Sequence, residues 1–229
     1  MSIIFNKLKA HALELEKVLS ARAFLLPQEC DLAWTSRSYN CAWFRRANID
    51  VIDAIDTKGL WMMHLCVFPH VYDGAPVYGF DIIAGKHKVT GAFLDFSPIN
   101  PEHKLLDYFE DLVEPMHWDK TRELPDWAKR IFSPSMLAVG NINSEFELEA
   151  VLELSKKSLE YYIDSILKYR PPLSYDELVK QYNYTEQQNY YCQQQKQNPH
   201  TPKVLKALGF SEEMIHDFIH KELFPELVG

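Results

Sequence analysis

The sequence predicts an α+β fold, a three-layer α/β/α sandwich in which helices flank a central antiparallel sheet. Segments rich in β-branched and aromatic residues gather between Leu32 and Phe96, and helical periodicity dominates the second half of the chain. This distribution favours one antiparallel sheet covered by helices. The segment Leu60–Phe68 is apolar at almost every position, which indicates a strand buried on both faces.

Composition narrows the class of protein. With 47% hydrophobic residues the chain of 229 can form a sizeable core, and we expect a single domain over residues 1–229 that is monomeric. The net charge of -8 and the lack of a basic stripe disfavour nucleic-acid binding. We expect no secretory signal and no membrane span. A reduced, cytoplasmic protein is favoured because four cysteines form no CxxC pair: Cys30, Cys41, Cys66 and Cys192.

The first helix is amphipathic and is expected to end near Arg22. Its apolar positions, at helical spacing, are Ile4, Leu8, Ala12, Leu15 and Leu19. Strands follow with short breaks at "TKG", "YDGAP" and "AGKHK".

One hairpin can be placed in register. If Gly85-Lys86 is a two-residue type II′ turn, Ala84 faces His87 and Asp81 faces Thr90.

Helices return beyond Pro98. "PEHKLLDYFEDLV" has helical spacing, and "RIFSPSMLAV" predicts a last strand or two. Capping boxes at Ser144–Glu147 and Ser174–Glu177, the second after a stop at Pro171-Pro172, predict two long helices. The Gln-rich "QQNYYCQQQKQNPH" is expected to be helical, and a final helix begins near Ser211.

His64 lies in the middle of the buried strand "WMMHLCVFPH". A buried imidazole needs partners or loses its charge. Cys66 points to the same face, but two ligands do not make a metal site, so a core histidine beside a buried thiol is the favoured reading.

Asp81 lies between Phe80 and Ile82 in a strand that should be buried. It is either a strand-edge carboxylate capped by backbone amides or a functional acid. Asp95, just before Ser-Pro, is expected to cap a turn. A buried histidine and a buried aspartate on neighbouring strands can transfer protons.

Several motifs resemble the ferredoxin-dependent bilin reductases. They are "LWMMHLCVFP", "PVYGFDIIAGKHKVTGAFLDFSP", "RELPDW", "YYCQQQKQN" and "VLKALG", in order and with nearly gap-free spacing from about Leu60 onward. The resemblance implies radical reduction of biliverdin IXα, with electrons arriving singly from reduced [2Fe-2S] ferredoxin and no bound metal or organic cofactor. It also implies that the bilin lies between the sheet and the carboxy-side helices.

The resemblance assigns roles to individual residues. His64 and Asp81 match the histidine and aspartate that flank the bilin and supply protons. Thr90 matches a small hydroxyl residue that contacts a propionate.

Departures from the family pattern bear on the product. Where relatives have Asn-Asp-Lys-Thr this chain has Asn198-Pro199-His200-Thr201, so an acid is lost and His200 replaces a propionate-binding lysine. Asp50 and Ile52 stand near the positions of a histidine and a glutamate that serve the exovinyl group. These changes favour phycoerythrobilin, as made by a phage-encoded offshoot of the phycocyanobilin-forming branch. Phycocyanobilin, 15,16-dihydrobiliverdin and a non-catalytic bilin-binding protein are the alternatives.

Ferredoxin is strongly acidic, so this acidic protein needs a local basic patch to bind it. The candidates for this docking site are Lys86, Lys88, Lys203 and Lys206.

Overall fold

The computed structural model describes residues 3–26, 34–166, 168 and 173–228. Their centre is a 7-stranded antiparallel sheet in which every strand pairs with the next along the chain, in the order β1-β2-β3-β4-β5-β6-β7. The predicted antiparallel sheet is confirmed.

The strands are β1 (Phe24–Leu25), β2 (Thr35–Asn40), β3 (Phe44–Ala54), β4 (Leu60–Pro69), β5 (Val77–Gly85), β6 (Val89–Ser97) and β7 (Leu137–Val139). The helices are α1 (Ile3–Ser20), α2 (Ile55–Lys58), α3 (Lys104–Val113), α4 (Asp126–Lys129), α5 (Glu145–Ile166), α6 (Tyr175–Gln181), α7 (Thr185–Gln195), α8 (His200–Ala207), α9 (Glu212–Asp217) and the π-helical η1 (Phe218–Leu223). No helix in the described part of the chain is long and apolar enough to cross a membrane.

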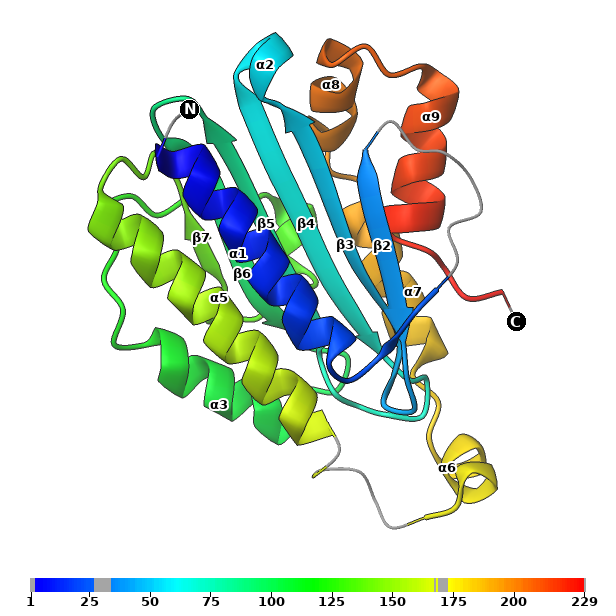
Figure 1. The fold of residues 1–229 in the computed structure, drawn as a ribbon. Coiled ribbons are helices and arrows are strands. Elements are labelled where there is room, and N and C mark those ends of the chain that lie inside the picture. The colour runs from blue at the N-terminus through cyan, green and yellow to red at the C-terminus, as the bar shows by residue number, and fades with distance from the viewer. Residues whose placement is uncertain (1–2, 27–33, 167, 169–172, 229) are drawn as a thin grey trace.

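Helices cover both faces of the sheet, as predicted. α1, α3 and α5 lie over one face, and α7, α8 and α9 lie over the other (Figure 1). Ion pairs such as Lys7 with Glu145 and Arg22 with Asp164 hold α1 beside α5.

The strand β4 shows why two helical layers are needed. Its odd-numbered residues, such as Met63 and Leu65, join the core under α1 and α5. Its even-numbered residues point to the opposite face, where Cys66 and Phe68 belong to a second apolar cluster with residues of α7, α8, α9 and η1. Both faces of this strand are buried, and helices on one side alone would leave one of them in water.

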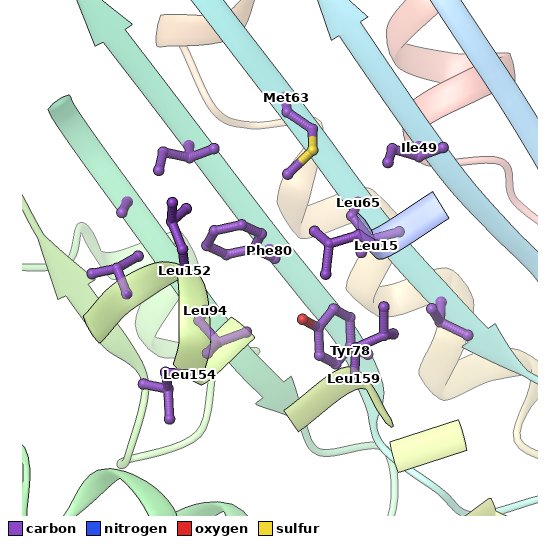
Figure 2. Close-up of a cluster of buried hydrophobic side chains, with 14 of the residues drawn as sticks. Leu15, Ile49, Met63, Leu65, Tyr78, Phe80, Leu94, Leu152, Leu154 and Leu159 are labelled. Carbon is purple, nitrogen blue, oxygen red and sulfur yellow. The ribbon is translucent and has the colours of Figure 1, made fainter. Parts of the chain in front are cut away.

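The core between the sheet and α1/α5 is large and almost wholly apolar. Figure 2 shows Leu15 of α1 and Leu152 and Leu159 of α5 gathered over Leu65 of β4 and Phe80 of β5. Leu65 and Phe80 are fully buried. Removing such side chains from water contributes about 1.5–3 kcal/mol each, so this layer supplies much of the stability of the fold.

The turn of the β5–β6 hairpin lies one residue later than predicted. The Gly85 N–H donates to the Lys88 carbonyl oxygen over 2.9 Å, which leaves Lys86-His87 as the turn. Ala84 pairs with Val89. The predicted Gly85-Lys86 turn and the pairing of Ala84 with His87 are therefore wrong.

A β-bulge follows this turn and changes the register again. Ile83 pairs with Gly91, so Thr90 is an extra residue in β6. Asp81 consequently lies opposite Phe93 and not opposite Thr90. The expected pairing failed because of the displaced turn and the bulge together, and a bulge has no strong sequence signal.

Most predicted helices are confirmed. α1 ends close to the expected Arg22, "PEHKLLDYFEDLV" contains α3, the Gln-rich segment contains α7, and Ser211 caps α9. Among the described residues of "RIFSPSMLAV" only β7 is a strand. Cys30, Leu32 and the stop at Pro171-Pro172 lie outside the described residues.

The two capping boxes differ. Both halves of the Ser174–Glu177 box are present, but α6 has only 7 residues and is not long. At α5 the Glu147 N–H donates to the Ser144 hydroxyl, whereas the Glu147 carboxylate accepts from the Asp119 N–H instead of closing the box.

A cavity in this core should be costly. We expect Leu65→Ala to lower the free energy of unfolding by about 2–5 kcal/mol, because the fully buried side chain leaves a void between β4 and α1. Urea denaturation measures this loss. The matched control is Leu13→Ala on α1. Leu13 is 55% exposed, so this substitution should lower the free energy of unfolding by less than about 0.5 kcal/mol. Equal losses would contradict the assigned core.

Candidate active site

A row of polar side chains crosses the sheet on the face covered by α7, α8 and α9. Ser36 of β2 pairs with Asp50 of β3, Asp50 pairs with His64 of β4, and His64 pairs with Asp81 of β5. Directly opposed residues of antiparallel strands point to the same face, with Cβ atoms about 4.5–5.5 Å apart. The register therefore gathers three titratable groups from three separate segments of the sequence.

His64 and Asp81 form a hydrogen-bonded pair. His64 Nδ1 lies 2.6 Å from Asp81 Oδ1, and the His64 side chain is 8% exposed against 41% for Asp81. Burial lowers the pKa of His64, but the charge and hydrogen bond of Asp81 outweigh it and raise this pKa well above its ordinary value. The pair thus holds a proton beside an opening to solvent.

Asp50 is a second carboxyl group on the other side of His64. Its residue is only 2% exposed, and the Ser36 hydroxyl donates to its Oδ1 over 2.5 Å. Burial raises the pKa of Asp50 to about 6, against smaller lowering effects of His64 and the Ser36 hydroxyl. Asp50 is therefore protonated in part near neutral pH.

The carboxy-terminal segment forms a wall over β3 and β4. The Phe224 ring packs edge-on against His64, with ring centroids 5.4 Å apart. Glu222 accepts from Arg46 over 2.9 Å, and its carbonyl oxygen accepts from Asn48 over 2.6 Å. These contacts close the site on the side of Asp50 and leave Asp81 as its open end.

A hollow of about 460 Å³ lies on the same face, between the end of β6, the residues after α4 and α7. Tyr191 of α7 lines it, and the same tyrosine packs against Phe224, which in turn contacts His64. The hollow itself is not lined by His64 or Asp81. It is lined by Pro98, Ile99, Arg130, Ile131, Glu186, Gln187, Tyr190 and Tyr191.

The other predicted substrate contacts take part in interactions that do not include the His64–Asp81 pair. Ile52 is buried in the apolar cluster under the carboxy-terminal helices. The Thr90 hydroxyl donates to the Ile83 carbonyl oxygen over 3.0 Å. Asn198 Oδ1 accepts from the His200 N–H over 2.9 Å, where α8 begins. None of these hydrogen bonds joins the side chains to His64 or Asp81.

The four candidate docking lysines lie in two groups. Lys86 lies in the β5–β6 turn and Lys88 directly follows it, and Lys203 and Lys206 lie on α8. Lys88 Nζ donates to Asn141 over 2.7 Å, whereas Lys206 forms a 2.6 Å ion pair with Glu212. The Glu212 carboxylate thus lies against Lys206, and the docking of ferredoxin by these four lysines stays a prediction.

Metal chemistry finds no support in the arrangement of side chains. Within the described ranges, no three or more His, Cys, Asp or Glu residues are placed to hold a metal ion. Cys66 lies beside His64 in β4, and burial raises the pKa of its thiol. The reading of His64 as a histidine outside any metal site stays a prediction.

Sequence reasoning missed three contributors to the site. Ser36 lies in the short polar strand "TSRSYN", and only the β2–β3 register reveals that it serves Asp50. Glu222 and Phe224 lie far along the chain, in a segment without a motif.

Asp95, expected to cap a turn, is instead buried and accepts from Ser97 and from the Ser133 N–H.

Comparisons with known proteins identify the family of this chain. The family model "Ferredoxin-dependent bilin reductase" matches residues 4–225. A phycocyanobilin:ferredoxin oxidoreductase of Prochlorococcus marinus is 32% identical over 182 residues, which is 79% of this chain and 71% of that protein.

Two solved structures share the fold. One, named PcyX, is 32% identical with a TM-score of 0.68, covering 96% of this chain and 99% of that one. The other is phytochromobilin synthase from tomato in complex with biliverdin, 18% identical with a TM-score of 0.71, covering 94% and 82%. The family match over nearly the whole chain leads to one conclusion: this protein is an oxidoreductase that belongs to the ferredoxin-dependent bilin reductase family.

Proposed function

We propose that this enzyme reduces biliverdin IXα to phycoerythrobilin, in a four-electron reaction whose electrons arrive singly from reduced [2Fe-2S] ferredoxin. The observation that carries the proposal is the His64–Asp81 pair, a shared proton held at the half-open end of a buried polar row. The family match supports the electron donor and the class of substrate. Biliverdin is bound in the tomato structure that shares the fold.

In this proposal Asp81 is the group that touches the pigment. Its side chain is 41% exposed, so a pyrrole nitrogen can reach the carboxylate without displacing the strand. Each added electron makes the pigment more basic, and a positioned acid then delivers a proton to it. His64 holds that proton until it is needed, because the carboxylate raises the pKa of the imidazole.

Burial of His64 strengthens this chemistry. Charge interactions are stronger where water is excluded, and Phe224 keeps water from one side of His64. A linear tetrapyrrole would approach from the side of Asp81, since Glu222 and Phe224 close the other side.

The product assignment depends on which acids are near the pigment. Ile52 is 5% exposed and packs among apolar side chains, so no proton donor stands at this position. Without a donor there, protonation of the exovinyl group is impaired, and phycoerythrobilin is the expected product. We also propose that this enzyme belongs to the phage-encoded offshoot of the phycocyanobilin-forming branch, as the missing acids indicate.

A second candidate product is phycocyanobilin. The specific observation that favours it is the 32% identity to a protein named phycocyanobilin:ferredoxin oxidoreductase. A non-catalytic pigment carrier is less favoured. Covalent attachment needs an accessible thiolate, whereas Cys66 and Cys192 are fully buried and burial raises the pKa of both thiols.

Removing the acid at Asp81 should slow turnover strongly. We expect Asp81→Asn to slow biliverdin reduction by about 10²–10⁴-fold, because an amide cannot deliver a proton. An anaerobic assay with ferredoxin, ferredoxin reductase and NADPH, followed by absorbance and chromatography, measures this. Asp53→Asn is the matched control, since Asp53 lies near the end of β3, two strands away from Asp81, and is paired with Lys9. Wild-type turnover by Asp81→Asn would show that the assigned role is wrong.

Supplying an acid should redirect the product. We expect Ile52→Glu, and separately Pro199→Asp, to give a measurable share of phycocyanobilin by chromatography. Ile52→Gln places a side chain of the same size and shape there without an acidic proton, so it should leave the product unchanged. Identical products from Ile52→Glu and Ile52→Gln would count against control by this position.

A further inference from the structure

A segment beside β6 has no part in the proposed reaction so far. It covers residues 122–133, "RELPDWAKRIFS", and includes the short helix α4. Its side chains Trp127, Ile131 and Phe132 pack in the apolar cluster under the carboxy-terminal helices. The segment therefore lies on the face of the sheet that carries His64 and Asp81, and we call it the side wall.

The side wall begins next to the open end of the site. The Arg122 N–H donates to the Ala138 carbonyl oxygen over 2.8 Å. The Arg122 guanidinium group donates to the Thr90 carbonyl oxygen and lies 5.8 Å from the centre of the Phe93 ring. Phe93 is directly opposite Asp81. A flat pigment that meets Asp81 from its open side therefore extends over Phe93 and reaches the side wall.

The side wall ends at a buried carboxylate. Asp95 of β6 is 1% exposed and lies two residues beyond Phe93, on the same face of the strand. The Ser133 N–H donates to Asp95 Oδ2 over 3.1 Å, and the Ser133 hydroxyl donates to Oδ1. The Ser97 hydroxyl donates to Oδ2 over 2.7 Å. Two of these three donors belong to the side wall, 38 residues further along the chain.

These contacts join two separate parts of the chain. A carboxylate without partners is costly in an apolar interior, and the three donors offset that cost. Ser97 lies in the same strand as Asp95, whereas Ser133 brings with it a segment that has its own buried side chains. Arg130 and Ile131, shortly before Ser133, line the hollow of about 460 Å³. Asp95 therefore fixes the place where the side wall meets the sheet.

We propose that Asp95 is a positioning residue: it holds the side wall against β6, so that this segment forms the flank of the pigment site beyond Asp81. The inference rests on the proposed function, which places the pigment beside Asp81. Asp95 does not touch the pigment and acts through Ser133.

Attachment of the side wall is coupled to a proton. Burial raises the pKa of Asp95 to about 6, against the lowering effects of the Ser133 and Ser97 hydroxyls and of the Ser133 and Phe96 N–H groups. Among the described residues, no charged group is a cause of this shift. When the side wall is detached, water reaches the carboxyl group and its pKa returns to the ordinary value. The attached state thus binds the proton more tightly, so attachment is strongest below pH 6 and weakens as the pH rises through 6.

Hydrogen exchange of the Ser133 N–H and of the amides beside it tests the attachment. Asp95→Ala should lower their protection about 10²-fold, because three donors lose their acceptor. In the wild type, protection corrected for the intrinsic exchange rate should fall about tenfold from about pH 5 to about pH 7. Asp95→Asn keeps an acceptor but cannot ionise, so it should lack this fall.

Binding and turnover of biliverdin test the positioning role. Asp95→Ala should raise both Kd and KM about tenfold and leave kcat within about twofold. The reason is that the side wall binds the pigment equally in the ground state and the transition state, while the His64–Asp81 pair stays intact. Leu159→Ala is the matched control. Leu159 is fully buried in the core on the opposite face, so this change destabilises the fold but should keep the wild-type Kd.

The outcomes separate this role from the function on which it rests. If the wild type neither binds nor reduces biliverdin, the proposed function is wrong and the positioning role falls with it. If the wild type turns over, wild-type protection at Ser133 in Asp95→Ala overturns the positioning role alone. An unchanged Kd in that variant, or a loss of kcat at unchanged KM, also overturns it. Should Asp95→Ala fail to fold, Ser133→Ala lacks one hydroxyl donor and must raise the Kd, and a wild-type Kd there overturns the role.

Discussion

The 2.6 Å contact between His64 Nδ1 and Asp81 Oδ1 exists because β4 and β5 pair in one particular register. A slip of one residue would turn every side chain of a strand to the opposite face. Such a slip would move His64 into the core under α1 and α5 and bring Leu65 out of it. The apolar packing of the amino-terminal layer therefore fixes the geometry of the polar row on the other face.

Two buried histidines show how the partner decides the charge. His11, between α1 and α5, has Ser155 as its partner at 2.8 Å, and burial lowers its pKa to about 4. His64 is buried as well, but a carboxylate at similar distance raises its pKa well above the ordinary value. One histidine is a neutral part of the core, and the other holds a proton. Burial alone therefore says little about the role of a histidine.

The sequence predicts much of the fold because its local signals agree with one another. The apolar run Leu60–Phe68 predicts a strand covered on both faces, and this prediction is confirmed. His64 and Asp81 are identifiable because each is a polar group in an otherwise apolar strand. The hairpin register failed because the turn lies at Lys86-His87 and a bulge at Thr90 adds one residue to β6. Ser36 and Phe224 could not be assigned to the site, since both contacts depend on tertiary structure.

Three acids and bases in one row cannot all be charged without cost. Asp50, His64 and Asp81 are neighbours, and two of them are almost excluded from water. An imidazolium between two carboxylates would leave a net negative charge in the interior, and such a charge is expensive there. Protonation of Asp50 removes that charge while the His64–Asp81 ion pair remains. In the proposed reaction, a reduced pigment beside Asp81 would add negative charge to the same region, and this would favour movement of the proton of the His64–Asp81 pair toward the pigment. The low polarity that makes the row costly to build would thus strengthen the force on that proton.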